Sequence, residues 1–221
     1  MGRLLDLCRS GTRWTDLRGN GAYPVNKSIL VNTTDVRYSN SAAMYLALAS
    51  FVANGNGIVS DESAAAGLAE SLAPLFLRQG YQESSSAGPF NDYLVMGPGK
   101  APLVMIYEAQ YLFEASRPDS GLNPQMVLLY PEPTLFTKHI LIPFTEPGEK
   151  LGTALTEDPE LQRLAIEHGF RNNDTKGFRA FVDGHRLAVP ETLVNVIEAP
   201  SYEILEGMIQ RIETIETGAA P

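Results

Sequence analysis

The stretch SILVNTTDVRYSNSAAMYLALASFVANG, residues 28–55, carries the clearest fold signal in the sequence. It opens with a short apolar run at residues 28–32 that follows a polar turn, which is typical of a β-strand. A polar segment comes next, and the apolar residues 42–54 then predict a helix that ends at Gly55. Because this helix is apolar on every side, we expect it to be buried.

Three further apolar runs predict extended structure. LVMIY at residues 103–107 and MVLLY at residues 126–130 are expected to be buried strands, and Pro131 stops the second one. HILIPF at residues 139–144 is also expected to be extended, and Pro143 places its end at a sheet edge.

Helix signals occupy much of the remaining chain. The sequence Asp158-Pro159-Glu160 combines an N-cap residue, an N1 proline and an early acid, and Gly169 is the matching stop. Residues 84–91, in contrast, are expected to form a loop. Further helices are expected at residues 3–9, 61–79, 109–115 and, after the capping Ser201, 202–212.

The segment at residues 175–187 fits two structures. Asp183-Gly184 is a hairpin-turn signal, whereas Phe178 and Phe181 fit one face of a helix, and we favour the helix. With this segment included, strands alternate with helices along the chain and the tail is helical. This order predicts an α/β fold with a largely parallel sheet and a helical C-terminal end.

Composition restricts the class of protein. Apolar residues make up 44% of the 221 residues and the formal net charge is −9, which is typical of a globular protein. The sequence has no basic run, which argues against binding to nucleic acid or to an anionic membrane. The single Cys8 excludes an intrachain disulfide, and the histidines are too scattered for a metal site: His139, His168 and His185. We therefore expect no metal, no cofactor and no nucleic-acid partner.

The common signatures of enzymes and of export are missing from the sequence. It contains no GxSxG, HExxH or P-loop pattern. The opening MGRLLDLCRSG lacks the apolar core and the small-residue cleavage site of a signal peptide. No apolar stretch is long enough to span a bilayer. We therefore expect a protein without catalytic activity.

The polar segment that leads into the helix at residues 42–54 is the first candidate binding site. The first turn of a helix leaves backbone N–H groups free and carries a partial positive charge, which suits a carboxylate, sulfate or phosphate. Side chains of this segment add hydroxyl, amide and guanidinium donors: Thr34, Arg37, Ser39, Asn40 and Ser41. The alternative is that Ser39 or Asn40 only caps the helix.

Tyr107 and Glu108 form the second candidate site. They lie where the expected strand at residues 103–107 ends and the next helix begins, and open α/β sheets bind ligands at such strand ends. Tyr107 would contribute its hydroxyl or its ring face, and Glu108 would accept a hydrogen bond from the ligand or pair with Arg37. The alternative is a tyrosine at a strand end followed by an acid that caps the helix.

Four segments together resemble bacterial extracellular solute-binding proteins. They are residues 28–55, PLVMIYEAQYL at residues 102–112, YPEPTLFTKHILIPF at residues 130–144 and LTEDPELQRLAIEHGFR at residues 155–171. The resemblance is to type II periplasmic binding proteins, near the molybdate and sulfate receptors of ABC importers, and covers residues 12–215. It implies a three-layer αβα fold in which two lobes clamp the ligand.

The resemblance also implies a domain division and a cellular role. Residues 12–125 would form the second, ligand-binding lobe, and residues 126–221 the returning part of the first lobe with the C-terminal helices. The chain would be a C-terminal portion of a receptor, without the signal peptide and the first half of lobe one. It would bind a small polar or anionic solute in the periplasm or at the cell surface and deliver it to an ABC permease. The exposed edge of the incomplete lobe would favour self-association.

Two other functions stay open at this stage. One is an extracytoplasmic sensor or interaction module that reuses the same fold. The other is an α/β hydrolase, although no pair of nucleophile and base stands out in the sequence.

Overall fold

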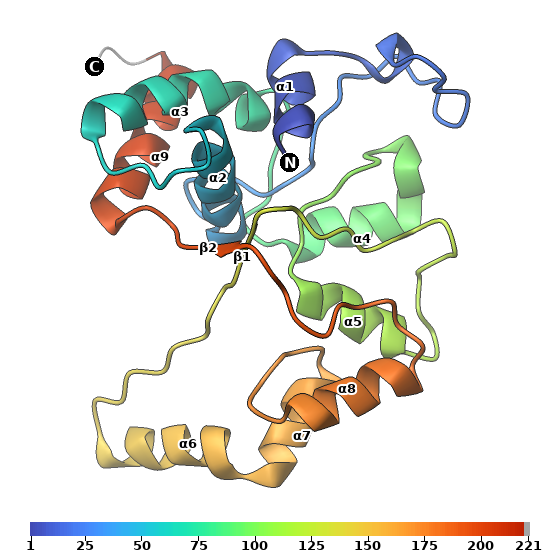
Figure 1. The fold of residues 1–221 in the computed structure, drawn as a ribbon, viewed down its shortest axis with the longest axis vertical. Coiled ribbons are helices and arrows are strands. Elements are labelled where there is room, and N and C mark those ends of the chain that lie inside the picture. The colour runs from blue at the N-terminus through green and yellow to red at the C-terminus, as the bar shows by residue number, and fades with distance from the viewer. Residues whose placement is uncertain (219–221) are drawn as a thin grey trace. The chain divides into compact units, whose positions relative to one another are not determined.

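Helices make up most of the computed structural model, which describes residues 1–218 (Figure 1). The chain is 51% helical, and the strands among the described residues are β1 (Thr134–Leu135) and β2 (Val196–Ile197), which pair in parallel. The helices are α1 (Gly2–Ser10), η1 (Trp14–Asp16), α2 (Asn40–Ala53), α3 (Glu62–Leu77), α4 (Ala87–Met96), η2 (Gly97–Gly99), α5 (Glu108–Ser116), α6 (Glu146–Glu157), α7 (Pro159–Glu167), α8 (Thr175–Gly184) and α9 (Tyr202–Thr217). The predicted three-layer αβα fold with a mostly parallel sheet is therefore wrong.

Two of the expected strands meet without forming a sheet. Residues 28–32 and 103–107 share one parallel bridge, between Asn32 and Val104. The N–H of Asn32 donates to the carbonyl of Leu103 at 2.8 Å. Ile29 and Val31 of the first segment are buried, but burial alone does not make a strand, because a strand also needs a partner for its backbone groups.

The third expected strand is not a strand in the structure, and it is only partly buried. Residues 126–130 belong to no strand, and the side chains of Val127 and Leu129 are 63% and 69% exposed. The alternation of exposed and covered side chains along this segment still follows the period of two that extended backbone imposes. The prediction of a buried strand at residues 126–130 is therefore wrong.

The predicted helices are confirmed, and several of them begin at the expected capping residue. The helix expected at residues 42–54 is α2, and most of its side chains are buried. Asp61 caps α3 by accepting a hydrogen bond from the N–H of Ala64 at 2.8 Å. Asp158 caps α7, and Ser201 caps α9, as the sequence predicted. The ambiguous segment at residues 175–187 contains α8.

Two helices lie where the sequence analysis did not expect them. The loop expected at residues 84–91 is wrong over most of its length, because α4 begins at Ala87 and includes Pro89. Helix α6 was not predicted, since its sequence contains two glycines and one proline. It forms nonetheless because Thr145 caps it and Pro147 lies in its first turn, where proline is tolerated.

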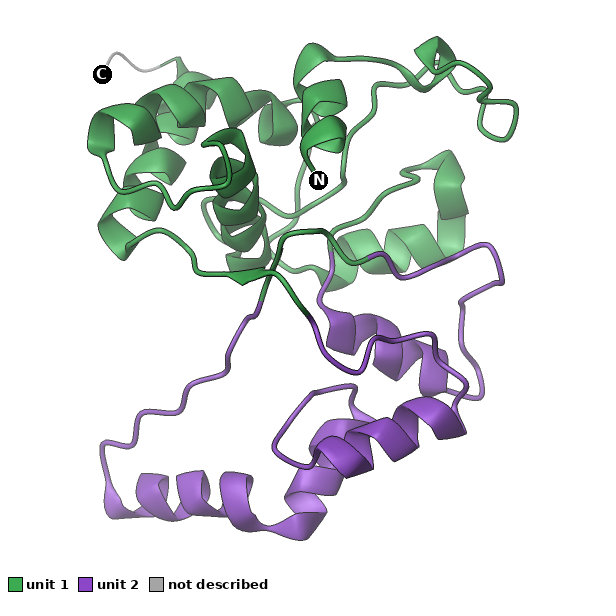
Figure 2. Cartoon of the chain, viewed as in Figure 1, with its two compact units in different colours: residues 1–105, 130–135, 194–221 green, residues 106–129, 136–193 purple. Residues whose placement is uncertain are grey.

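The chain divides into two compact units, and neither of them is continuous in sequence (Figure 2). Unit 1 consists of residues 1–105, 130–135 and 194–221, and unit 2 consists of residues 106–129 and 136–193. The chain therefore passes between the units four times, after residues 105, 129, 135 and 193. Strands β1 and β2 both belong to unit 1, and each lies beside one of these passages.

Unit 1 has a well-developed apolar core. Helices α2, α3 and α9 pack together, and α1 contacts α2 and α3. The largest side chains of this core include Tyr45, Phe76, Leu72 and Met208, and each is almost fully buried. Tyr45 and Phe76 meet edge to face, with ring centroids 5.7 Å apart. The extended segment at residues 28–32 and the start of α2 are held on this core.

Unit 2 has a much smaller core. Helix α7 contacts both α6 and α8, and the buried side chains are few: Leu112, Met126, Ile166, Phe178, Val182 and Val189. Gly169, which ends α7, has a φ of 83° and lies against α5. A Cβ at Gly169 would lie 2.5 Å from the carbonyl oxygen of Ala109, so only glycine fits this contact.

Candidate functional site

The residues ahead of α2 form a chain of three hydroxyl groups. Thr34 Oγ1 lies 2.7 Å from Ser41 Oγ, and Ser39 Oγ lies 3.0 Å from the same atom. Thr34 and Ser41 are 1% and 4% exposed, whereas Ser39 is half-buried. The sequence analysis selected these three side chains as candidate ligand contacts, and the fold places their hydroxyl groups within hydrogen-bond distance of one another.

Ser39 is the N-cap residue of α2 by position, but its side chain does not cap the helix. Its φ and ψ of −130° and 124° are those of an N-cap, yet its hydroxyl makes no hydrogen bond to the first-turn N–H groups. The hydroxyl bonds to Ser41 instead. The alternative that Ser39 only caps the helix is therefore not what the structure shows.

The hydroxyl chain retains one hydrogen for another acceptor. Each of the three hydroxyls has one hydrogen to donate, and two hydrogen bonds within the chain use two of them. Since Ser39 is the least buried of the three, it is the member that water or a solute reaches first. The cluster thus presents the hydroxyl of Ser39, which can donate or accept a hydrogen bond, toward the protein surface.

Arg37 does not bring a net positive charge to this cluster. Its guanidinium binds Asp35 through two nitrogens, at 2.9 Å and 2.6 Å, and also pairs with Glu216 at 3.0 Å. The bond from Arg37 lowers the pKa of the Asp35 carboxyl. Two carboxylates around one guanidinium make the local charge negative, which disfavours a fully anionic solute. Asn40, the first residue of α2, is exposed.

Tyr107 and Glu108, the other predicted site residues, lie at the start of α5 in unit 2. Tyr107 is the N-cap residue, and its backbone N–H donates to Oε1 of Gln110 at 3.1 Å. Glu108 accepts two hydrogen bonds from Arg171, at 2.7 Å from Nε and 2.9 Å from Nη2. Its partner is therefore a residue of the same unit that the sequence analysis did not select.

Arg171 joins three parts of unit 2. Besides Glu108, it donates to the carbonyl oxygens of Pro190 and Glu191 at 2.7 Å and 2.9 Å, and its guanidinium lies 4.6 Å from the ring centre of Phe178. A guanidinium has five N–H donors in a planar fork, so one arginine can hold all of these groups. In the sequence, Arg171 stands at the end of the HGFR segment at residues 168–171, and no local pattern there indicates that it pairs with Glu108.

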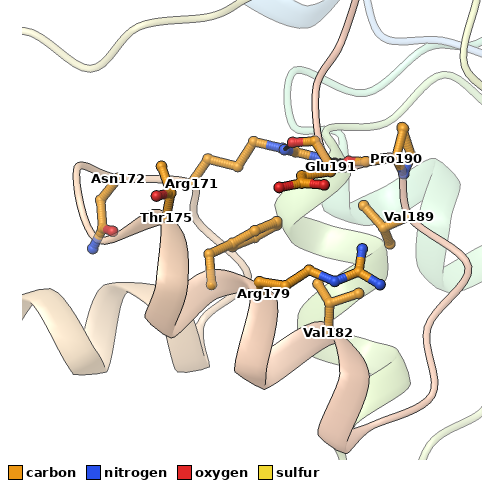
Figure 3. A pocket seen from close by; sticks show the side chains of 9 residues that line it. Arg171, Asn172, Thr175, Arg179, Val182, Val189, Pro190 and Glu191 are labelled. Carbon is orange, nitrogen blue, oxygen red and sulfur yellow. Dashed lines mark hydrogen bonds between the residues drawn. The ribbon is translucent and has the colours of Figure 1, made fainter.

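A pocket of about 170 Å³ borders this arginine (Figure 3). Its walls come from the residues just before α8, from one side of α8 and from the segment after it, and the exposed surface of the walls is mainly apolar. The residues that line it are Arg171, Asn172, Thr175, Phe178, Arg179, Val182, Val189, Pro190 and Glu191. None of the predicted site residues lines this pocket, and its two arginines are already paired, with Glu108 and with Asp183.

Comparisons with protein-family models, with curated proteins and with solved structures gave no match to this chain. Two further searches of residues 1–218 were also negative. They found no group of three or more His, Cys, Asp or Glu side chains placed to hold a metal ion. They also found no helix that is both long enough and apolar enough to cross a membrane.

Proposed function

We propose that this chain binds a small polar solute without transforming it, as the solute-binding subunit, or part of one, of a bacterial ABC importer. It would act outside the cytoplasm and would deliver its solute to a permease. The resemblance of residues 28–55, 102–112, 130–144 and 155–171 to such receptors supports the proposal. The proposal does not include the three-layer sheet, which the structure contradicts.

The observation that carries the proposal is the division into two interleaved units. The chain passes between them four times. Two of these passages lie beside β1 and β2, which pair with one another inside unit 1. Units joined by several short connections move as bodies about a few hinge residues, which is how two-unit receptors respond to their ligands. In a single folded domain followed by a tail, the chain would leave the domain only once, and no such hinge would form.

The polar cluster ahead of α2 supports a particular solute chemistry. The hydroxyl chain of Thr34, Ser41 and Ser39 offers a hydroxyl group at the surface, and Arg37 is neutralised by Asp35 and Glu216. A neutral solute with hydroxyl or carbonyl acceptors suits this arrangement better than an oxyanion does. We therefore place sugars, polyols and neutral amides ahead of sulfate, phosphate and molybdate.

The same cluster argues against the hydrolase alternative. A serine nucleophile needs a general base within hydrogen-bond distance. Among residues 1–218, the side-chain hydrogen bonds of Ser39 and Ser41 go to hydroxyl groups, which are not bases at neutral pH. The other alternative, a sensor or interaction module, would bind a solute in the same way. It would differ from an importer subunit only in the partner that responds to the bound state, which would not be a permease.

The test is a thermal-shift screen of the chain against neutral sugars, polyols, amides and oxyanions, followed by calorimetric titration of each hit. Ser39→Ala should weaken binding of the best neutral solute about 10-fold, because one hydrogen bond contributes about 1.5 kcal/mol or less. Ser116→Ala is the matched control, since its hydroxyl also bonds within the fold, to the carbonyl of Phe113 at 2.8 Å. No hit in the screen, or equal affinities for both variants, would overturn the proposal.

A further inference from the structure

The pocket beside Arg171 contains none of the side chains assigned to the solute site. All the residues that line it belong to unit 2, and they come from one stretch of the chain, residues 171–191. Its walls therefore depend only on how α8 packs with the segments before and after it. The cavity of about 170 Å³ is smaller than the roughly 300–1,000 Å³ of pockets that take drug-sized molecules, so it suits a ligand with few heavy atoms.

The floor of the pocket is apolar. Phe178 and Val182 lie one turn apart on α8, and both are buried, as is Val189 in the segment after the helix. The guanidinium of Arg171 lies over the Phe178 ring, 4.6 Å from its centre. Such a floor favours a hydrocarbon or aromatic group, because that group is removed from water when it binds.

Arg171 holds the pocket together and is not the group that meets a ligand. Its guanidinium is occupied by Glu108 and by the carbonyl oxygens of Pro190 and Glu191, at 2.7 to 2.9 Å. These bonds fix the backbone of residues 190–191 beside α8. The pocket is therefore formed before a ligand arrives, which lowers the entropy cost of binding.

Glu191 contributes a negative charge to the pocket. Its side chain comes from the segment after α8 (Figure 3). In the part of the chain that the structure describes, the Glu191 carboxylate takes part in no ion pair and accepts no hydrogen bond. A carboxylate beside an apolar floor is complementary to an ammonium group that is attached to an apolar body.

Arg179 contributes a positive charge from α8. Asp183, one turn further along the helix, engages Nε and Nη2 of Arg179 at 3.0 Å and 2.6 Å. Because a guanidinium has five N–H donors, those on Nη1 remain for a second acceptor. Both side chains of this pair are about half exposed, and exposed pairs at this helical spacing are weak. Asp183 therefore competes little with the carboxylate of a ligand.

We propose that this pocket binds a free α-amino acid with an apolar side chain, such as leucine or phenylalanine. The α-ammonium group pairs with Glu191, the α-carboxylate accepts from Nη1 of Arg179, and the side chain lies on the floor of Phe178, Val182 and Val189. The proposal is independent of the proposed function, since the two sites share no residue and lie in different units.

The charges around the pocket favour a zwitterion over a ligand with a single charge. A simple acid would meet the Glu191 carboxylate, and a simple amine would meet the Arg179 guanidinium, so each would be repelled by one of the two groups. An uncharged hydrocarbon would remove water from both charges and offer them no partner. A zwitterion satisfies both of them.

The test is calorimetric titration of the full chain with L-leucine and L-phenylalanine. Isoamylamine and isocaproate are titrated beside them, because they keep the hydrocarbon body of leucine and carry only one of its two charges. At least one amino acid should bind, and the amine and the acid should each bind at least about 10-fold more weakly than leucine or not at all. No heat of binding with either amino acid would overturn the proposal, and so would an amine or an acid that binds as tightly as leucine.

Two variants test whether the amino acid binds in this pocket. Glu191→Gln and Arg179→Gln should each weaken its binding at least about 10-fold, since each removes one charged partner from an exposed position. Glu149→Gln, on the surface of α6, and Arg163→Gln, which pairs on the surface of α7, are the matched controls. Ser39→Ala should also leave this affinity unchanged, which separates the pocket from the solute site. Unchanged affinity in either pocket variant, or an equal loss in its control, would show that the amino acid binds elsewhere.

Discussion

Units 1 and 2 bury their apolar side chains to very different extents. In unit 1, α2 and α3 keep Leu46 and Leu72 fully buried, and α9 closes the core with Met208. In unit 2, Leu151 of α6 is 51% exposed and Ile140 is 80% exposed. Similar residue types thus have different environments, because three long helices surround one another in unit 1 and the helices of unit 2 are shorter.

This difference indicates which unit contributes more to the stability of the chain. Burial of apolar surface is the main favourable term in folding, so unit 1 should supply most of the free energy of unfolding. Unit 2 depends more on specific polar contacts such as those of Arg171. Trp14, the single tryptophan, lies in unit 1 and makes the two units separable by fluorescence.

The largest expected effect is from truncating the core of unit 1. Leu46→Ala should lower the free energy of unfolding by about 2–5 kcal/mol, because it removes buried methyl groups and leaves a cavity. Leu151→Ala removes the same atoms from an exposed site on α6 and should change stability very little. Urea unfolding followed by Trp14 fluorescence measures the first effect. Equal costs for the two variants would contradict the comparison between the units.

The second effect belongs to unit 2. Arg171→Met should destabilise unit 2 by about 2–3 kcal/mol, since it removes the guanidinium that pairs with the half-buried Glu108 carboxylate and donates to two carbonyl groups. Hydrogen exchange should rise in α5 and α8, while the Trp14 transition stays in place. Arg163→Gln is the control, because Arg163 pairs with carboxylates at the surface. A shifted Trp14 transition would show that the units unfold together.

A smaller effect concerns acid. The bond from Arg37 lowers the pKa of Asp35 in the folded state, so this carboxylate favours folding above its unfolded pKa of about 3.9. That contribution is lost as the pH falls through the lower, folded-state pKa. Asp35→Asn should therefore flatten the acid side of the stability profile of unit 1, as measured by Trp14 fluorescence. An unchanged acid slope in this variant would refute the coupling.

The smallest effect is at alkaline pH. Burial raises the pKa of the Cys8 thiol to about 11, so the thiol favours folding below its unfolded pKa of about 8.5. This contribution is lost as the pH rises through the folded-state value.

At pH 8, modification of Cys8 by a disulfide reagent should require opening of unit 1, and Leu46→Ala should accelerate it. Rapid labelling of the native chain would mean that Cys8 is accessible.

Part of the site was predictable from the sequence. The pattern of residues 33–41 identified Thr34, Ser39 and Ser41, which the fold joins by hydrogen bonds, because all three lie within one short segment ahead of a helix. The partners of Arg37 and Glu108 were not predictable. Glu216 and Arg171 are far away in sequence, and no local pattern specifies contacts over such distances.

The sequence by itself determined the local structures. Helix α2 follows from a continuous apolar stretch that ends at Gly55. Helices α3, α7 and α9 follow from their apolar residues and from caps such as Asp61 and Ser201, which are interactions between near neighbours in the chain. The expectation of extended backbone at residues 126–130 and 139–144 likewise rested on local residue preference.

Only the tertiary structure decided whether those extended segments became a sheet. A strand is stabilised by hydrogen bonds to another strand that is distant in sequence, and its residues do not specify that partner. In this chain β1 pairs with β2, whereas residues 137–144 form no backbone hydrogen bonds with another strand among the described residues. The prediction of an αβα sheet was wrong for that reason: it assigned non-local pairing from a local pattern.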